Sequence, residues 1–373
     1  MAKSDKTRVL VIYGGRSAEH EISLLSARFV VDSLDRGRFE PLLVAIDPDG
    51  RWRLQGEDDL PRCRDPREAR MNPDGPGATL HPMPVTDDRP GLLHVDGAAP
   101  EPFDVAFPVL HGPMGEDGCM QGLFELASVP FVGSGVTGSA VGMDKLIQKQ
   151  ILETAEVPVV PYVGLLERRW NEERAEAIGD CEALGYPLFV KPANLGSSLG
   201  IGVAHQRADL EGVVAQALRF DTKLVVERGL SKAREIECSV LGNDDPQVSL
   251  PGEIVVDHAD GFYSYEAKYI DAEGAKLCVP ADLYHAEVGA IQLLALRAYR
   301  ALDCAGMARV DLFVTADRAV FLNEINTIPG FTAISMYPQL WAASGLAPEQ
   351  LVTRLVELAI ERHHRRASLR TRR

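Results

Sequence analysis

The sequence lacks the features that mark several large classes of protein. Its six cysteines lie at positions 63, 119, 181, 238, 278 and 304, so no two form the close pair of a zinc knuckle or a redox motif. We interpret them as single thiols of a reducing compartment and expect a cytoplasmic protein. No apolar run reaches the ~18 residues that a membrane-spanning helix needs, so we expect no membrane segment. The chain has no Gly-Lys pair, which excludes a Walker A phosphate loop.

Positive charge is also scarce. The 373 residues contain 39 Lys and Arg against 54 Asp and Glu, which gives a net charge of −15. Six of the arginines lie in residues 362–373, where there is no acid, so the rest of the chain is more acidic still. A protein that binds nucleic acid needs a basic surface to displace counterions, and we therefore expect no nucleic-acid partner. We interpret residues 363–373 as a frayed basic tail.

The pattern of apolar residues predicts an α/β protein with three units. Residues 1–133 alternate strand-like runs with helical periods, which is typical of a small parallel-sheet domain. An irregular insertion with short hairpins interrupts it at 56–102, where nine prolines and five glycines occur. Residues 134–226 form a central unit, and residues 227–362 form an α+β unit whose strands alternate as half-buried antiparallel strands do. Further expected elements are a strand over 129–132, one helix over 139–156, and a closing helix over 352–360.

Two late segments place polar residues inside apolar strand patterns. Residues two apart on a strand share a face, so Arg309 and Asp311 of MARVDLFV project together, as do Glu324 and Asn326 of VFLNEIN. Two carboxylates and an amide oxygen suit a hard cation such as Mg2+, and Arg309 can neutralise charge on a reacting oxygen. The alternative is a solvated strand face with an ion pair. We favour the metal site.

Two glycine-rich segments are candidates for phosphate binding. Lys191 ends a predicted strand and leads into PANLGSSLGIG, where a lysine and backbone N–H groups can meet a phosphate, with a flexible hairpin as the alternative. GSGVTG at 133–138 has the spacing of a dinucleotide-binding turn. The acids that follow it lie in the predicted helix rather than at the end of a strand. We therefore interpret this second segment as an interdomain hinge.

Three further segments allow both a functional and a structural interpretation. Glu19 follows the first strand, where it can bind a substrate ammonium group or favour a first helical turn, and the residues alone favour the helical turn. FYSYEAKY at 262–269 is either a lid over a pocket or a packed hairpin. In NTIPGFTAIS a tight turn at 329–330 precedes a helix expected from Thr332. Backbone N–H groups there, with Ser335, would suit an oxyanion or a carboxylate.

Taken in order, seven segments resemble one family, the D-alanine–D-alanine ligases of the ATP-grasp superfamily. The resemblance spans residues 14–345 and implies three α/β domains, with ATP held between two antiparallel sheets. It also implies the reaction. The carboxylate of one D-alanine attacks the γ-phosphate of ATP, and the amine of a second D-alanine displaces phosphate from the acyl phosphate to give a dipeptide for peptidoglycan synthesis. The segments are GGRSAEHEIS, HGPMGEDGCMQG, PFVGSGVTGSAVGMDK, FVKPANLGSSLGIG, YEAKY, ARVDLF and NEINTIPGFT.

The resemblance implies roles for residues around the amino-acid substrates. Glu19 would bind the ammonium group of the first D-alanine, with Ser197 and Tyr269 as hydrogen-bonding partners under a closing lid. His111 would lie near the carboxylate of the first substrate, and Ser335 would bind that of the second. Arg309 and the N–H of Gly330 would stabilise the oxyanion. The catalytic set implied in this way is Glu19, Ser197, Tyr269, Arg309, Gly330 and Ser335, and the substrate-binding set is Glu19, His111, Arg309 and Ser335.

The resemblance also implies ATP and Mg2+ as cofactors, with Mn2+ as a substitute for Mg2+. Lys145 and Lys191 would bind the α- and β-phosphates and Lys268 the γ-phosphate. Glu227 and Leu230 would lie at the adenine, although the intervening Arg228-Gly229 replaces an aromatic residue found in some relatives. Glu235 would bind the ribose. The ATP-binding set is Lys145, Lys191, Ser197, Ser198, Glu227, Leu230, Glu235, Lys268, Asn323 and Glu324, and the metal ligands are Asp311, Glu324 and Asn326.

Other activities remain open at this stage. A D-alanine–D-lactate ligase is the first alternative, but Tyr269 in EAKY favours the dipeptide enzyme. An NAD-dependent oxidoreductase that uses GSGVTG would leave the three metal ligands unexplained, and a regulator without turnover would not need Arg309 beside them. The family resemblance further implies a homodimer formed through the N-terminal domain.

Overall fold

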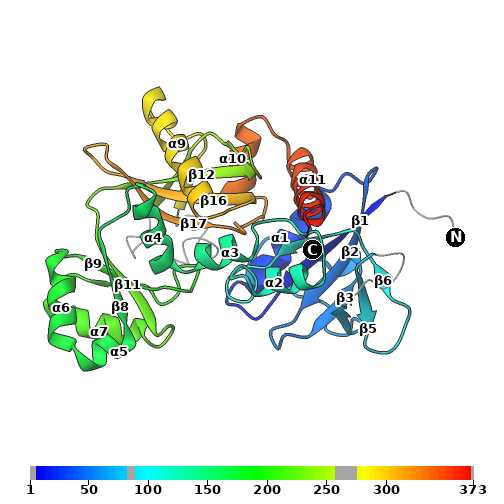
Figure 1. The fold of residues 1–373 in the computed structure, drawn as a ribbon, viewed down its shortest axis with the longest axis horizontal. Coiled ribbons are helices and arrows are strands. Elements are labelled where there is room, and N and C mark those ends of the chain that lie inside the picture. The colour runs from blue at the N-terminus through cyan, green and yellow to red at the C-terminus, as the bar shows by residue number, and fades with distance from the viewer. Residues whose placement is uncertain (1–5, 82–88, 257–274, 371–373) are drawn as a thin grey trace.

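The computed structural model describes residues 6–81, 89–256 and 275–370. The chain forms three lobes, coloured blue to cyan, green, and yellow to orange along the sequence (Figure 1). None of the helices within the described ranges is both long and apolar enough to span a membrane.

The N-terminal lobe is built on a sheet with strand order β3-β2-β1-β7. The β1, β2 and β7 strands are parallel, and β3 runs antiparallel to β2. Within the predicted insertion, β4, β5 and β6 form a small antiparallel sheet. The elements are β1 (Thr7–Gly14), α1 (His20–Asp32), β2 (Phe39–Ile46), β3 (Trp52–Gln55), 3-10 turns at Glu57–Asp59 and Pro66–Glu68, β4 (Ala78–Leu80), β5 (Gly91–His94), β6 (Glu101–Pro102), β7 (Val105–Val109) and α2 (Cys119–Leu126).

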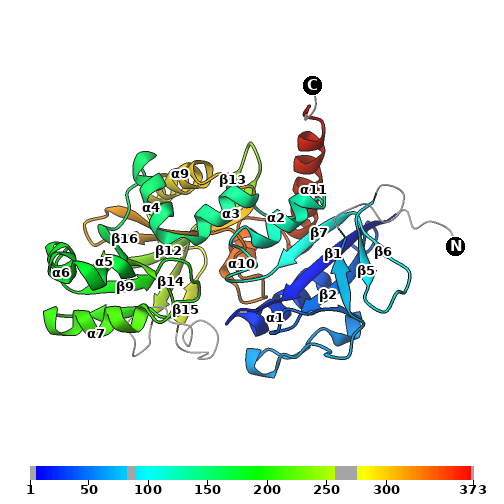
Figure 2. The same cartoon turned by 60° about the horizontal axis from the view of Figure 1, so that its bottom comes forward.

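The central lobe carries an antiparallel sheet with strand order β10-β9-β11-β8. Its core gathers apolar side chains from that sheet and from the helices α5, α6 and α7, and these helices lie in the green lobe in Figure 2. The elements are α3 (Val136–Met143), α4 (Lys145–Thr154), β8 (Tyr162–Leu166), α5 (Glu167–Glu172), α6 (Arg174–Ala183), β9 (Leu188–Pro192), β10 (Gly202–Ala204), α7 (Arg207–Ala217) and β11 (Lys223–Arg228).

The C-terminal lobe has a larger antiparallel sheet with strand order β15-β14-β12-β16-β17, and β13 pairs with β12. One face of this sheet packs against α9, which the sequence analysis did not anticipate. The elements are β12 (Arg234–Gly242), β13 (Gln247–Val248), β14 (Gly252–Val256), β15 (Ala275–Cys278), α9 (His285–Ala301), β16 (Gly306–Val314), β17 (Val320–Asn326), α10 (Met336–Ala343) and α11 (Pro348–Ala367).

The N- and C-terminal lobes share one hydrophobic core. Side chains of α10 and α11 belong to the same buried cluster as those of β1, β2, β7 and α1. Phe331, which precedes α10, packs edge-on against Phe107 of β7, with ring centroids 6.0 Å apart. The last helix therefore belongs to the N-terminal sheet as much as to its own lobe.

Several predicted helices and strands end differently in the structure. The helix expected over 139–156 is two helices, because the side chain of Asp144 accepts hydrogen bonds from the N–H groups of Leu146 and Ile147 and caps a new helix there. Residues 129–132 form only an isolated bridge from Phe131 to Ala106 rather than a strand.

The C-terminal helices also differ from their predicted bounds. Thr332 does not begin a helix. Its N–H donates to the Ser335 hydroxyl in a turn, and α10 starts only at Met336. The closing helix runs over Pro348–Ala367 rather than 352–360. The first residues of the expected basic tail are therefore helical, and Arg362 binds the carbonyl oxygens of Phe131 and Gly133.

The GSGVTG segment does not form a nucleotide site. A Cβ on Gly138 would lie 2.4 Å from the carbonyl oxygen of Asp303, so this glycine permits close packing of α3 on the C-terminal lobe. The N–H of Ala305 donates to the Ser134 hydroxyl over 3.1 Å. These contacts tie the segment to the C-terminal lobe, and none of its residues lines the large pocket between the lobes, as a dinucleotide turn would.

Candidate active site between the three lobes

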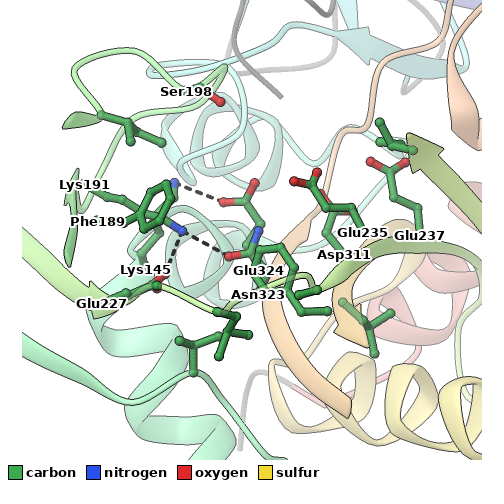
Figure 3. A pocket seen from close by; sticks show the side chains of 18 of the residues that line it. Lys145, Phe189, Lys191, Ser198, Glu227, Glu235, Glu237, Asp311, Asn323 and Glu324 are labelled. Atoms are coloured by element: carbon green, nitrogen blue, oxygen red, sulfur yellow. Dashed lines mark hydrogen bonds and ion pairs between the residues drawn. The ribbon is translucent and has the colours of Figure 1, made fainter. Parts of the chain in front are cut away.

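A pocket of about 320 Å³ lies between the antiparallel sheets of the central and C-terminal lobes. One end is apolar and contains Phe189, Leu230 and Leu312. The other end is polar and contains the side chains of Lys145, Lys191 and Glu324 (Figure 3). An apolar slot that leads to lysines and carboxylates suits a nucleotide, with its base in the slot and its phosphates among the charges. Ten of the predicted residues line it: Lys145, Lys191, Ser197, Ser198, Glu227, Leu230, Glu235, Asp311, Asn323 and Glu324, with Lys191 at the strand end as expected.

Three carboxylates lie in register across adjacent strands of the C-terminal sheet. Glu237 of β12 is paired with Asp311 of β16, which is paired with Glu324 of β17. In the next row, Arg309 is paired with Asn326. Because side chains alternate across a strand, both rows face the pocket side of the sheet, as the spacing predicted for Asp311, Glu324 and Asn326.

Arg309 lies within a network of carboxylates. Its guanidinium donates to both oxygens of Asp311 over 2.8 and 2.7 Å. Its Nε lies 3.0 Å from Oε2 of Glu237, which is almost fully buried. The amide of Asn326 donates to Asp311 over 3.1 Å. The positive charge of Arg309 therefore offsets carboxylates that would otherwise repel each other inside the protein.

A bulge in β17 brings an additional side chain into the pocket. The register shifts so that Asp311 pairs with Glu324 while Leu312 pairs with Leu322, which leaves Asn323 as the extra residue. Strict alternation would put Asn323 on the opposite face from Glu324, but a bulge re-aims a side chain. Asn323 accepts a hydrogen bond from Lys191 over 3.2 Å. Both residues face the polar end of the pocket (Figure 3).

Lys145 is held at the start of α4. Its backbone N–H donates to Ala193, and its Nζ donates to the carbonyl oxygen of Leu195 over 2.6 Å. The same Nζ lies 3.3 Å from Glu324. Lys145 thus joins α4, the glycine-rich loop and β17 at the polar end of the pocket.

Glu227 is a buried carboxylate between two lysines. Its two oxygens lie 2.7 Å from Lys149 and 2.7 Å from Lys191. Burial alone would raise the pKa of Glu227, but the two ammonium groups outweigh burial and lower this pKa to about 2. Glu227 is therefore an ionised acceptor at the wall of the pocket.

The glycine-rich loop turns sharply where it joins the pocket to the N-terminal lobe. Ser197 and Ser198 have φ angles of 50° and 58°, a left-handed conformation that L-residues seldom adopt. This turn directs the Ser197 hydroxyl to the carboxylate of Glu19, to which it donates a short hydrogen bond. The sequence alone favoured a helical-turn role for Glu19, whereas the structure places Glu19 in a polar pocket.

A smaller pocket of about 80 Å³ lies beside the first, and residues of all three lobes line it. Ser197, Glu237 and Glu324 line both pockets, so the two spaces meet at these side chains. A small polar cavity next to the phosphate end of a nucleotide pocket can hold a small charged molecule. The predicted residues that line it are Glu19, His111, Ser197, Arg309, Glu324, Asn326, Gly330 and Ser335.

His111 lines the small pocket, but both of its ring nitrogens have partners within the protein. Nδ1 lies 3.1 Å from the carbonyl oxygen of Ile328, and Nε2 lies 3.2 Å from the hydroxyl of Ser26. Burial lowers the pKa of His111, which favours the neutral ring. His111 therefore joins the segment around Ile328 to α1 and shapes the pocket wall.

The turn after β17 closes the other side of the small pocket. A Cβ on Gly330 would lie 3.0 Å from the Ser335 hydroxyl, so the turn and the start of α10 approach each other here. The Ser335 hydroxyl is 2.8 Å from that of Thr332. Gly330 and Ser335 are therefore adjacent, as the predicted roles in binding an oxyanion and a carboxylate require.

Four pocket residues or their direct partners escaped the sequence analysis. Glu237 was detectable, because it alternates with Glu235 on one strand. Glu116 lies within the HGPMGEDG segment, but only the fold brings it beside Glu19. Phe189 and Lys149 looked like ordinary members of a strand and a helix, and only the pairing of β9, β11 and α4 brings them to Glu227. Lys268 and Tyr269, the predicted lid residues, lie outside the described residues.

Family models of a two-part ligase match most of the chain. The model described as D-ala D-ala ligase N-terminus matches residues 8–134, and the model described as D-ala D-ala ligase C-terminus matches residues 151–357. The chain belongs to the D-alanine–D-alanine ligase family. This membership confirms the predicted family and an enzyme of the ligase class.

Individual relatives cover nearly the whole chain. A D-alanine–D-alanine ligase of Shouchella clausii is 46% identical over 367 residues, which is 98% of each protein. The solved D-alanine–D-alanine ligase of Coxiella burnetii is 36% identical with a TM-score of 0.82, covering 98% of this chain and 97% of that one. The VanG D-Ala:D-Ser ligase of Enterococcus faecalis is 33% identical with a TM-score of 0.82, covering 95% of this chain and 99% of that one. The predicted α/β fold is confirmed.

Membership of the D-alanine–D-alanine ligase family implies the use of ATP and Mg2+. The side chains available fit a hard cation, because Asp311, Glu324 and Asn326 place oxygens on one face of neighbouring strands. In the described parts of the chain, no three His, Cys, Asp or Glu side chains gather into a metal-binding group. The ligand set that fits best is thus two carboxylates and one amide, beside the lysines that would meet phosphate.

Proposed function

We propose that this chain joins two D-alanine molecules into D-alanyl-D-alanine and converts ATP to ADP and phosphate. The observation that carries this proposal is the junction of the two pockets at Ser197 and Glu324. A small amino acid bound against Glu19 would direct its carboxylate toward the phosphate end of the nucleotide pocket. Positioning the two reactants in this way supplies a large part of the catalysis of such a transfer.

Glu19 and the size of the small pocket select the first substrate. The buried carboxylate of Glu19, held by the Ser197 hydroxyl, attracts an ammonium group. Glu116 lies close by and accepts a hydrogen bond from the N–H of Gly112 over 2.8 Å. A pocket of about 80 Å³ is consistent with a small amino acid as the substrate.

The lysines and Arg309 stabilise charge in the first step. As the substrate carboxylate attacks, negative charge spreads over the transferred phosphoryl oxygens. Lys145 and Lys191 flank the space where these oxygens would lie, and Arg309 lies at the end toward the amino acid. We propose Asp311, Glu324 and Asn326 as the residues that hold Mg2+, with Mn2+ as a substitute. When bound, the ion would neutralise phosphate charge.

In the second step the amine of the second D-alanine attacks the acyl phosphate, and an oxyanion forms. Arg309 and the backbone N–H of Gly330 are the groups we propose to stabilise it. Ser335, at the start of α10, would bind the carboxylate of the second substrate. The acyl phosphate is prone to hydrolysis, so its position deep between the lobes protects it from water.

We infer that the enzyme acts in the cytoplasm, where ATP is supplied, and that it forms a homodimer through its N-terminal lobe. The family resemblance supports the homodimer, and light scattering of the purified protein tests it. A mass of about one 40.7 kDa chain at micromolar concentration would contradict the dimer.

The first experiment measures Mg2+-dependent ADP release with D-alanine alone, L-alanine alone, and D-alanine combined with D-lactate or D-serine. We expect release with D-alanine alone and a dipeptide as the product. Release that rises only with D-lactate would indicate a depsipeptide ligase, and a preference for D-serine would match the activity named for VanG. ATP binding without release on any substrate would contradict a ligase.

A variant separates the proposed metal role from nucleotide binding. We expect Asp311→Asn to lower turnover by at least about a hundredfold while ADP binding without metal changes little, because the loss is a transition-state effect. Asp317→Asn, in the exposed turn after the same strand, is the matched control. Equal turnover of the two variants would remove Asp311 from the metal set.

A further inference from the structure

Glu227, a buried carboxylate at the wall of the nucleotide pocket, is paired with two lysines, and the proposed chemistry uses only one of them. Lys149 is 1% exposed and does not line the nucleotide pocket, yet its Nζ lies 2.7 Å from Glu227. Lys191 lines the pocket and contacts the other oxygen of the same carboxylate. One negative charge is therefore shared between an inner lysine behind the wall and an outer lysine at the ligand.

The arrangement follows from the local fold. On β11, Glu227 faces the pocket side of the central sheet while Leu224 and Val226 pack in the core below it. On β9, Phe189 is the register partner of Glu227, and Lys191 lies two residues further on the same face. Lys149 comes from α4, one turn after Lys145, so both lysines of that helix point toward the pocket wall.

Of the two lysine ammonium groups, only that of Lys191 can reach a ligand in the pocket. Lys191 also contacts Asn323 and borders the polar end, so it can turn to a phosphate. Lys149 is enclosed, with its Nζ 5.7 Å from the centre of the Tyr162 ring, and cannot reach a phosphate in the pocket. If Lys191 alone paired with Glu227, a phosphate that recruited Lys191 would leave a buried carboxylate without compensation, which is strongly unfavourable.

We propose that Lys149 is a positioning residue for nucleotide binding: it keeps Glu227 paired and in place, so that Lys191 can move to the phosphates of the nucleotide. Lys149 does not touch the nucleotide and acts only through Glu227 and Lys191. The inference rests on the proposed function in one respect, namely that the larger pocket binds an adenine nucleotide. It predicts that Lys149 contributes to the affinity for ligands that carry phosphates and not to the affinity for the base alone.

The test compares ADP with adenosine, which lacks phosphate, by calorimetry and by competition. For Lys149→Met we expect ADP to bind about tenfold more weakly, which corresponds to about 1.4 kcal/mol. The affinity for adenosine should change less than about twofold, because Lys191 still pairs with Glu227 when no phosphate is present. The KM for ATP should rise with the KM for D-alanine unchanged, and Lys149→Arg should restore most of the ADP affinity.

A matched control and a second variant keep the test decisive. Arg168→Met removes an exposed cation of α5 in the same lobe, where it pairs with Glu172 outside the pocket, and it should leave both affinities unchanged. If Lys149→Met does not fold, Lys149→Gln keeps a donor without the charge and should show the same ADP-specific loss. Equal weakening of ADP and adenosine, or no weakening of either, overturns the inference.

Failure of the inference can be told apart from failure of the proposed function. Both ligands are measured by binding, so the assay does not depend on dipeptide formation. A wild-type protein that binds ADP but forms no dipeptide would refute the ligase activity and leave Lys149 testable. A wild-type ligase whose Lys149→Met variant binds ADP normally would refute only the role of Lys149.

Discussion

At the scale of single residues, the site depends on charges that are buried in unequal surroundings. Glu19 is nearly buried and its carboxylate accepts from Ser197. Glu227 is buried between two lysines, whereas Glu116 is buried near the carboxylate of Glu19. The two lysines lower the pKa of Glu227, whereas burial raises the pKa of Glu116.

Glu19→Gln should weaken the first D-alanine site. The amide keeps the shape and an acceptor for Ser197 but removes the charge that attracts the ammonium group. Charged hydrogen bonds contribute about 1.5–3 kcal/mol, so KM for D-alanine should rise at least about tenfold while ADP binding stays constant. Glu21→Gln, which changes the next acid of α1 outside the pocket, is the control. Unchanged D-alanine kinetics in Glu19→Gln would contradict the assignment.

Glu116 should make stability depend on pH. Burial, and then the nearby charge of Glu19, raise the pKa of Glu116 to about 8 from an ordinary value of 4.5. Between these two pH values the folded chain keeps a proton that the unfolded chain loses. The contribution of Glu116 to the free energy of unfolding therefore falls as the pH rises through this window.

The variant Glu116→Gln removes this titration. It retains an acceptor for the N–H of Gly112, so we expect its melting temperature relative to wild type to increase from pH 5 to pH 8. Differential scanning fluorimetry of the ligand-free protein at both pH values measures the change. Glu176→Gln, at an exposed helical site, should show no such trend. The same difference from wild type at both pH values would argue against a protonated Glu116.

At the scale of elements, the sequence patterns predicted strands better than the places where elements break. The strand at 320–326 was expected with the bounds that the structure shows, because alternation and apolar content agree there. The bulge at Asn323 and the break at Asp144 were not expected. A bulge is a property of two paired strands, and a cap competes with helix continuation through a single side chain, so neither changes the hydrophobic period.

In the candidate site, too, some residues could be found from the sequence pattern and others could not. Asp311, Glu324, Asn326 and Arg309 could be found from the sequence because they repeat at the spacing of one strand face. The residues alone left the role of Glu19 open and gave Ser335 only a general role in anion binding, and the role of His111 came only from the family resemblance. Lys149 and Glu116 were not identified as site residues, because their contacts depend on packing between elements that lie far apart in the chain.

The close approach of the glycine-rich loop to the small pocket leads to a testable prediction. A Cβ on Gly196 would lie 3.2 Å from the carboxylate of Glu19 and 3.9 Å from that of Glu116. Gly196→Ala should therefore intrude on the small pocket and raise KM for D-alanine several-fold, with a smaller effect on ATP. Gly212→Ala, where a Cβ meets nothing within 4 Å in α7, should leave both constants unchanged and stabilise the helix by about 0.5–1 kcal/mol. Equal KM values for D-alanine in the two variants would show that the loop moves to accommodate the added methyl group.

At the scale of the whole molecule, the small pocket exists only while the three lobes keep their places. Glu19 and His111 come from the N-terminal lobe, Ser197 from the central lobe, and Arg309 and Ser335 from the C-terminal lobe. The shared core between α11 and the N-terminal sheet fixes two of these lobes together. Substrate affinity should therefore respond to contacts far from the pocket.

Arg362 is such a contact. Its guanidinium lies 4.6 Å from the ring centre of Phe131 and donates to the carbonyl oxygens of Phe131 and Gly133, in the segment that follows the N-terminal lobe. Burial lowers the pKa of Arg362 to about 10, so the group remains charged at neutral pH. Arg362→Met would keep part of the apolar contact but leave two carbonyl groups without their donor.

We expect Arg362→Met to lower the free energy of unfolding by about 1–3 kcal/mol, the cost of leaving buried acceptors unpaired. Urea denaturation measures this, with Arg370→Met in the exposed end of the chain as the control. Because Arg362 joins α11 to the end of the N-terminal lobe, which carries Glu19, we expect KM for D-alanine to rise, whereas ADP binding depends on the other two lobes and should stay constant. A destabilised variant with normal D-alanine kinetics would show that the shared core alone positions the N-terminal lobe.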